Sequence, residues 1–89
     1  MKPFKQLERI VRGFANHRRI EILNLLIRRP ELSVVEISKI LDVNFKTISE
    51  HISRLANAGL VLKRNEGAAV RHKLTPRAIV ILKFLRTLE

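Results

Sequence analysis

Residues 33–59 read SVVEISKILDVNFKTISEHISRLANAG, and this stretch decides the fold. It opens with a capping box, in which Ser33 and Glu36 each accept a hydrogen bond from the other's backbone N–H, so a short helix is predicted to begin there. Asn44 is a favoured N-cap residue and predicts a second helix over about 45–58. Two short helices joined by so few residues are typical of a helix-turn-helix motif.

The second helix of this motif has two chemically different faces. Its apolar residues recur at helical spacing and are expected in the core: Phe45, Ile48, Ile52, Leu55 and Ala56. The other side carries polar side chains of short to medium reach, which suit the major groove of DNA, and the helix N-terminus attracts phosphate. The predicted DNA-binding residues here are Asn44, Lys46, Thr47, Ser49, Glu50, His51 and Arg54. The alternative interpretation is a polar face that is merely solvated.

The chain on both sides of the motif completes one predicted domain over 1–89. Gly13 is expected to end the first helix, and Gly59 is expected just after the helix over 45–58. A glycine between two strand-like runs predicts a hairpin, and Thr75-Pro76 predicts the start of a last helix. Besides the motif, the predicted elements are helices over about 4–13, 16–28 and 76–88 and strands over about 60–66 and 69–74. The predicted fold is mostly α with a small β-hairpin, a winged helix-turn-helix (helix-helix-helix-helix-hairpin-helix).

The hairpin region over 60–74 is predicted to be a basic wing. Its strands carry four basic residues, which favour contact with the DNA backbone or the minor groove. Protection of an edge strand by charged side chains is the alternative role, and the two are compatible. Two further basic residues, near the start of the second helix of the chain, are also expected to contact phosphate. The predicted phosphate-contacting residues are Lys63, Arg64, Arg71, Lys73, Arg18 and Arg19.

Composition favours a polyanionic partner and excludes several classes of site. The 89 residues include 18 Lys and Arg against 8 Asp and Glu, which gives a formal net charge of +10 and favours nucleic acid as the partner. The absence of cysteine excludes disulfides, thiolate zinc sites and cysteine nucleophiles. The three histidines are scattered and no glycine-rich phosphate loop is present, so neither an enzyme nor a cofactor is predicted. No apolar run is long enough to cross a membrane, and a cytoplasmic protein is expected.

The helix-turn-helix itself is not basic, which leaves two alternatives to a sequence-specific regulator. Residues 31–58 carry three basic and four acidic side chains, whereas the flanks 1–30 and 59–89 carry the positive charge. A near-neutral motif is compatible with a protein-interaction or assembly module, and the basic flanks with a non-specific architectural DNA-binding protein. Convergence of the flanking basic residues beside the helix over 45–58 would favour DNA binding, and their scattering would favour the interaction module.

The two terminal helices are predicted to form a symmetric dimer interface. The last helix is apolar over a wider arc than one core face requires, and the first helix carries an apolar stripe as well. The predicted interface residues are Leu7, Ile10, Val11, Phe14, Ile79, Val80, Leu82 and Leu85. The alternative is a monomer in which the first helix covers the last.

Several segments, in this order, resemble the ArsR-type winged-helix transcriptional regulators. FANHRRIEIL (14–23) resembles their L-A-D-x-x-R-x-x-I-L, and NFKTISEHISRL (44–55) resembles their recognition helix, S-x-x-T-V-S-x-H-L-x-x-L. AGLV (58–61) and RNEG (64–67) resemble the segments that lead into their wing. The resemblance implies a homodimer of winged helices, built through the terminal helices, that represses or activates by binding operator DNA.

The sequence departs from the metal-sensing members of this family. Those members carry E-L-C-V-C-E-L where this chain has ELSVVEI (31–37), so both thiolates are absent. A second family site uses Asp, His and Glu on the last helix, whose only acidic residue here is Glu89. A member without a metal site is therefore predicted. At the wing tip, Ala68 stands where the family often has Arg, so the wing cations would have to act from the strands.

Taken together, these features predict a homodimeric repressor of prokaryotic type. The helix over 45–58 is expected in the major groove and the wing over 60–74 on the backbone of double-stranded DNA. The operator is expected to be roughly palindromic, with half-sites about one helical turn apart. The sequence does not identify an effector, and three alternatives stay open: an organic ligand at the dimer interface, a partner protein, or no effector at all.

Overall fold

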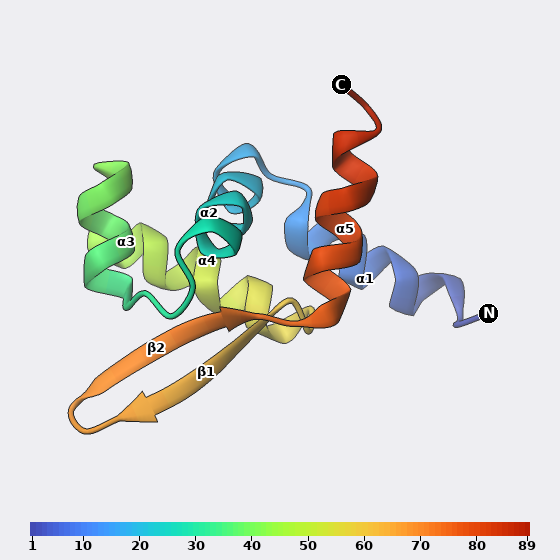
Figure 1. Ribbon diagram of the computed structural model, residues 1–89. Coiled ribbons are helices and arrows are strands. Elements are labelled where there is room, and N and C mark those ends of the chain that lie inside the picture. The colour runs from blue at the N-terminus through green and yellow to red at the C-terminus, as the bar shows by residue number, and fades with distance from the viewer.

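The computed structural model describes residues 1–89 as five helices and one two-stranded sheet (Figure 1). The order of the elements confirms the predicted winged helix-turn-helix fold. The hairpin projects from the helices, and both chain termini lie away from its tip (Figure 1). None of the helices combines the length and the apolar character that a membrane span requires. The elements are α1 (Phe4–Phe14), α2 (His17–Arg28), α3 (Val34–Leu41), α4 (Phe45–Asn57), β1 (Val61–Glu66), β2 (Ala69–Leu74) and α5 (Pro76–Arg86).

Local hydrogen bonds set the start of each helix in the helix-turn-helix. The Ser33 hydroxyl oxygen accepts from the Glu36 N–H at 3.1 Å, and the Glu36 carboxylate accepts from the Ser33 N–H at 2.9 Å, which confirms the predicted capping box. Asp42 adopts the left-handed conformation, with φ 54°, and so ends α3 and turns the chain toward α4. Asn44 then caps α4, because its side-chain oxygen accepts hydrogen bonds from two N–H groups of the first turn.

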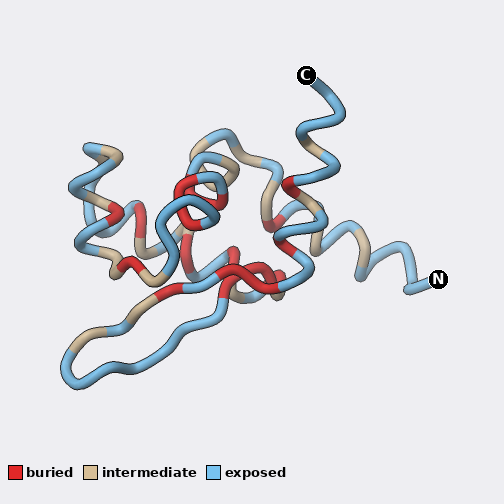
Figure 2. The backbone as a smooth tube through the Cα atoms, viewed as in Figure 1, coloured by how far each residue is buried: buried red, intermediate tan, exposed pale blue.

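Fifteen buried apolar residues form one core cluster, to which α2 contributes four residues and α4 contributes three. Figure 2 shows the buried residues gathered where α2, α4 and the root of the hairpin meet, whereas most of α1 and the hairpin tip are exposed. Burial of one such Leu or Ile side chain contributes about 1.5–3 kcal/mol. The core therefore holds α4 firmly by one face. Its central members are Ile22, Leu23, Leu26, Ile48, Ile52 and Leu55, each no more than 1% exposed.

The wing is an antiparallel hairpin with a tight turn. Val61 lies opposite Leu74 at its root, and Glu66 lies opposite Ala69 at its tip. Gly67 is the first residue of the turn and has φ 60°, which glycine adopts without the steric penalty of a side chain. A positive φ at this position is what two-residue hairpin turns require.

The root of the wing is tied to the connection between α2 and α3. The His72 N–H donates to the Leu32 carbonyl oxygen at 3.0 Å, and the Glu31 N–H donates to the His72 carbonyl oxygen at 2.8 Å. The ring Nδ1 of His72 also lies 2.9 Å from the Leu32 carbonyl oxygen, so this nitrogen carries a hydrogen. Because His72 is only 1% exposed, burial lowers its pKa and keeps the ring neutral.

Three sequence-based expectations are wrong in detail. Gly13 does not end the first helix but lies inside α1, buried, because the helix crosses close to Ala58 there. Phe45 is 53% exposed rather than in the core, because it is the first residue of α4 and lies beyond the part of the helix that packs on α2. The last helix ends at Arg86, two residues earlier than expected.

Candidate nucleic-acid interface

The outer face of α4 is exposed along the length of the helix. The predicted residues Ser49 and His51 are half-buried at its flanks, and Asn44 is exposed at the N-terminus, where its side chain is engaged as the cap. The opposite face is core, so this outer face is accessible to a partner without any change in the fold. Its exposed polar residues are Lys46, Thr47, Glu50, Ser53, Arg54 and Asn57.

Arg19 ties α4 to the end of α1. Its Nε donates to His51 Nδ1 at 3.2 Å, and its Nη1 donates to the carbonyl oxygens of Arg12 and Gly13 at 3.0 and 3.3 Å. A cation at a helix C-terminus is favourable, because the last carbonyl groups of the helix carry partial negative charge. Burial, together with the nearby Arg19 charge, lowers the pKa of His51. In this structure Arg19 therefore positions two helices, although sequence analysis predicted a phosphate contact for it.

A groove with basic walls runs between α1 and the C-terminal half of α4. It has a volume of about 460 Å³. It continues onto the outer face of α4, because Arg54 and Asn57 line both the groove and a shallow hollow along that face. Four of the eight basic residues of the N-terminal flank thus converge beside α4, the arrangement that favours DNA, whereas Arg18, Arg28 and Arg29 do not line the groove. The charged residues that line the groove are Lys5, Glu8, Arg9, Arg12, Arg19 and Arg54.

The four basic residues predicted on the wing fall into two pairs. Lys63 and Lys73 are exposed and form no ion pair. Arg64 and Arg71 lie directly opposite each other in the strand register, so two like charges face each other across the hairpin. Such a pair destabilises a hairpin unless nearby anions compensate it.

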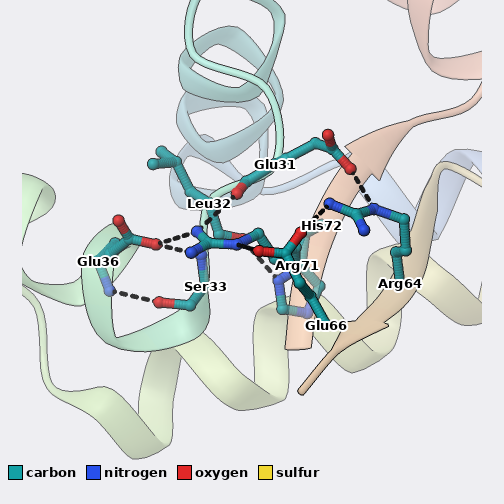
Figure 3. A network of polar contacts seen from close by, with 8 residues as sticks. All are labelled: Glu31, Leu32, Ser33, Glu36, Arg64, Glu66, Arg71 and His72. Atoms are coloured by element: carbon teal, nitrogen blue, oxygen red, sulfur yellow. Dashed lines mark hydrogen bonds and ion pairs between the residues drawn. The ribbon is translucent and has the colours of Figure 1, made fainter. Parts of the chain in front are cut away.

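Carboxylates compensate the two facing arginines (Figure 3). Arg64 donates to Glu31 at 2.6 Å and to Glu66 at 2.8 Å. Arg71 donates to Glu36 and to the Glu31 carbonyl oxygen, at 2.9 and 3.1 Å, and its Nε lies 3.6 Å from Glu66. The hydrogen bond from Arg64 lowers the pKa of Glu66, and the capping hydrogen bonds at Ser33 lower that of Glu36. Phosphate would therefore compete with carboxylates for Arg64 and Arg71, whereas the two lysines are free.

The terminal helices leave apolar side chains in contact with solvent. Phe4 is 80% exposed on α1, and Val80 and Phe84 are 65% and 56% exposed on α5. α1 packs on α4, and α5 packs on α2 and β2. Leu82 is buried in the protomer's own core, so it offers no area to a partner. The other predicted interface residues are exposed or half-buried, namely Leu7, Ile10, Val11, Phe14, Ile79, Val80 and Leu85.

Sequence analysis missed two groups of residues near this interface. The basic residues of α1 were overlooked because only the apolar stripe of that helix was considered, although Lys2, Lys5, Arg9 and Arg12 recur every three or four residues. Two of the three carboxylate partners of the wing arginines, Glu31 and Glu36, had no sequence signal, because they lie more than thirty positions away along the chain. Arg18 forms an ion pair with Glu21 at 2.7 Å and lines none of these grooves.

Comparison with known families and proteins shows the same fold and motif elsewhere. Residues 16–63 match the family described as bacterial regulatory proteins of the arsR family. A homodimeric winged helix-turn-helix DNA-binding domain from Mycobacterium bovis superimposes with a TM-score of 0.87 at 27% identity, covering 96% of this chain and 79% of that one.

Two curated relatives share more sequence but differ in their named activities. A protein of Halobacterium salinarum, named as a proposed arsenical resistance operon repressor, is 36% identical over 74 residues, which are 82% of this chain and 57% of that protein. The transcriptional activator HlyU of Vibrio cholerae is 36% identical over 66 residues, which are 74% of this chain and 60% of HlyU. The chain thus spans less than two thirds of the length of either relative.

Proposed function

Because this chain belongs to the arsR family of bacterial regulatory proteins, which are not enzymes, we propose that it binds operator DNA as a transcriptional regulator. The observation that carries the proposal is the outer face of α4, which is polar and exposed while the opposite face is locked in the core. A helix held in this way is rigid enough to place side chains on base edges in the major groove.

Specific roles follow from the reach and position of each side chain on α4. Lys46 and Arg54 donate to guanine acceptors or to phosphates, and Thr47 and Ser49 contact base edges or phosphates near the helix start. Glu50 accepts from cytosine amino groups. On the wing, Lys63 and Lys73 contact the phosphate backbone, since they form no ion pair that would have to be broken.

In-vitro selection from a random duplex library at about 150 mM salt tests this function. We expect an enriched inverted repeat, whose enrichment is lost in the Lys46→Glu and Arg54→Glu variants. Binding without enrichment would support the architectural alternative, and no binding at all would support the protein-interaction module. Retained wild-type affinity in both variants would refute the recognition-helix assignment.

The regulator is proposed to act as a homodimer through α1 and α5, whose apolar side chains are exposed. Support comes from the homodimeric relative and from the size of the exposed apolar groups, which small monomers rarely leave uncovered. Val80→Glu places a charge in this interface, and sedimentation velocity is expected to show a monomer. A dimer that persists in this variant would contradict the interface.

Repression without a metal sensor is the proposed mode of action. Simple occupancy of an operator suffices for repression, and one relative of this chain is named as a repressor, whereas another is named as an activator. At the start of α3, Ser33 and Val35 stand where metal-sensing members carry cysteines, and Ser33 serves as the N-cap instead. Zn²⁺ or arsenite is therefore expected to leave operator affinity unchanged in a binding titration, and in-vitro transcription is expected to fall when protein is added.

A further inference from the structure

We propose that the basic face of α1 is a second DNA-binding element, which holds backbone phosphates beside the base pairs that α4 contacts. The inference rests on the proposed DNA-binding function and extends the interface to a helix outside the helix-turn-helix and the wing. The residues that carry it are Lys5, Arg9 and Arg12 on α1, together with Arg54 on α4. They line one groove between the two helices.

The groove exists because α1 and α4 approach each other closely. Gly13 of α1 contacts Ala58, the C-cap residue of α4, so tightly that a Cβ atom at position 13 would lie 2.3 Å from the Ala58 Cβ. At 3.6 residues per turn, the basic residues of α1 fall on one side of this contact line, and Phe4, Leu7 and Val11 fall on the other side. α1 therefore has separate faces for a partner copy and for an anion.

The electrostatics of the groove favour an anion. Five basic side chains and one carboxylate, Glu8, line it. Glu8 lies 3.9 Å from Arg12, and both side chains are largely exposed, so this ion pair is weak. Lys5, Arg9 and Arg54 form no ion pair. Concave surfaces lined by one sign of charge focus the field and concentrate counter-ions.

The shape of the groove favours a DNA backbone over a small anionic ligand. Small-molecule sites are mostly apolar and enclose their ligands, whereas one hydrophobic residue, Ala58, lines this open groove. The α1 cations are long, exposed side chains spread over about two helical turns, which suits a run of phosphates better than one point charge. The groove also continues directly onto the face of α4 that is proposed to read bases, through Arg54 and Asn57.

The test compares a groove variant with a charge-matched control on the selected duplex. The double variant Lys5→Gln, Arg9→Gln removes two groove cations, and Arg28→Gln, Arg29→Gln removes two exposed cations at the end of α2 that line no groove. Fluorescence anisotropy measures affinity over a salt series, since each phosphate contact contributes about 0.9 to the slope of log affinity against log salt. For the groove variant we expect a slope lower by about 1–2 per protomer and roughly tenfold weaker binding near 150 mM salt.

Phosphate ethylation interference then locates the contacts. Ethylation of the DNA phosphates that lie at the groove is expected to weaken binding by the wild-type protein. The same ethylation is expected to have no effect on binding by the groove variant, while the selected base sequence stays the same. An equal loss of slope in both double variants, or an unchanged interference pattern, would overturn the inference. Saturation of the groove by inorganic phosphate alone, seen as shifts of the Arg9 side-chain NMR signals with no effect on duplex affinity, would assign it to a free anion instead and would also overturn it.

The design separates this inference from the proposed function. If wild-type protein binds no duplex, the DNA-binding function itself fails. If wild-type protein binds its selected duplex and the groove variant binds equally well, only the role of α1 fails. Circular dichroism melting confirms that the groove variant is folded, which is expected because both substituted side chains are exposed.

Discussion

The contact between α1 and α4 gives a sharp prediction at Gly13. In an isolated helix, replacing an interior glycine with alanine stabilises the helix by about 1 kcal/mol. Here the new Cβ would lie 2.3 Å from the Ala58 Cβ, far inside van der Waals contact. Ala58 is buried and its Cβ is fixed to the backbone, so the clash is relieved only if the two helices move apart.

The balance of the two effects sets the expected magnitude. Overpacking of a well-packed contact costs about 1–3 kcal/mol, and the helix propensity of alanine offsets about 1 kcal/mol of that. Gly13→Ala is therefore expected to lower the free energy of unfolding by about 0–2 kcal/mol. In a domain of this size the upper end of that range corresponds to a melting temperature lower by roughly 15 °C.

A double-mutant cycle with Ala58→Gly isolates the free-energy cost of the clash between the side chains at positions 13 and 58. Ala58→Gly restores the missing space, so the double variant is expected to recover most of the lost stability, with a coupling energy of about 1–3 kcal/mol. Urea unfolding at a fixed protomer concentration provides the measurement, since dimerisation makes apparent stability concentration-dependent. Stabilisation by Gly13→Ala alone, or additive effects in the cycle, would refute the close approach of α1 and α4.

The remaining predictions concern the N-cap of α4, the wing network and the buried histidine. Asn44→Ala is expected to lower the free energy of unfolding by about 1 kcal/mol in urea, whereas Asn44→Asp retains it; equal loss in both would contradict the cap. Glu66→Gln breaks exposed ion pairs worth about 0–1 kcal/mol, so melting changes little. The wing arginines keep Glu31 and Glu36 as partners but lose one competing carboxylate, so the salt dependence of DNA binding is expected to become steeper; an unchanged slope would contradict this. Burial lowers the pKa of His72, so below about pH 6.5 the unfolded chain takes up a proton that the folded chain excludes, and stability falls with falling pH. His72→Gln should flatten this pH dependence in urea unfolding, and an unaltered dependence would point to other groups.

The secondary structure was predictable wherever a local hydrogen bond or a hydrophobic period decides it. The capping box at Ser33 and the cap at Asn44 act within four residues, so the sequence alone was sufficient to place α3 and α4. Gly13 misled the prediction because glycine has two uses, to end a helix and to admit a neighbour. Only the contact with Ala58, 45 positions away along the chain, shows which of these two roles Gly13 has.

The candidate site was predictable in its residue types but not in its pairing. The outer face of α4 follows from helical spacing, and the structure leaves it exposed as expected. The wing arginines were expected to be as available as the lysines, yet Arg64 and Arg71 meet carboxylates brought in by the α2–α3 connection and α3. No local rule predicts such partners, because the α2–α3 connection is brought beside β2 by a long-range backbone bridge between Leu32 and His72.

The position of α1 beside α4 explains why the positive charge of the chain lies in the flanks and not in the helix-turn-helix. A near-neutral helix-turn-helix is poor at attracting DNA but good at discriminating, because acidic groups such as Glu50 penalise wrong bases and non-specific phosphate contacts. In the proposed complex, the attraction is supplied from outside the motif, by α1 on one side and by the wing lysines on the other. If this division holds, cations removed from α1 weaken binding to all duplexes alike, whereas changes at Lys46 or Glu50 alter which duplex is preferred. Parallel affinity measurements on the selected duplex and on a scrambled one distinguish the two effects, and loss of preference in the α1 variant would contradict the division.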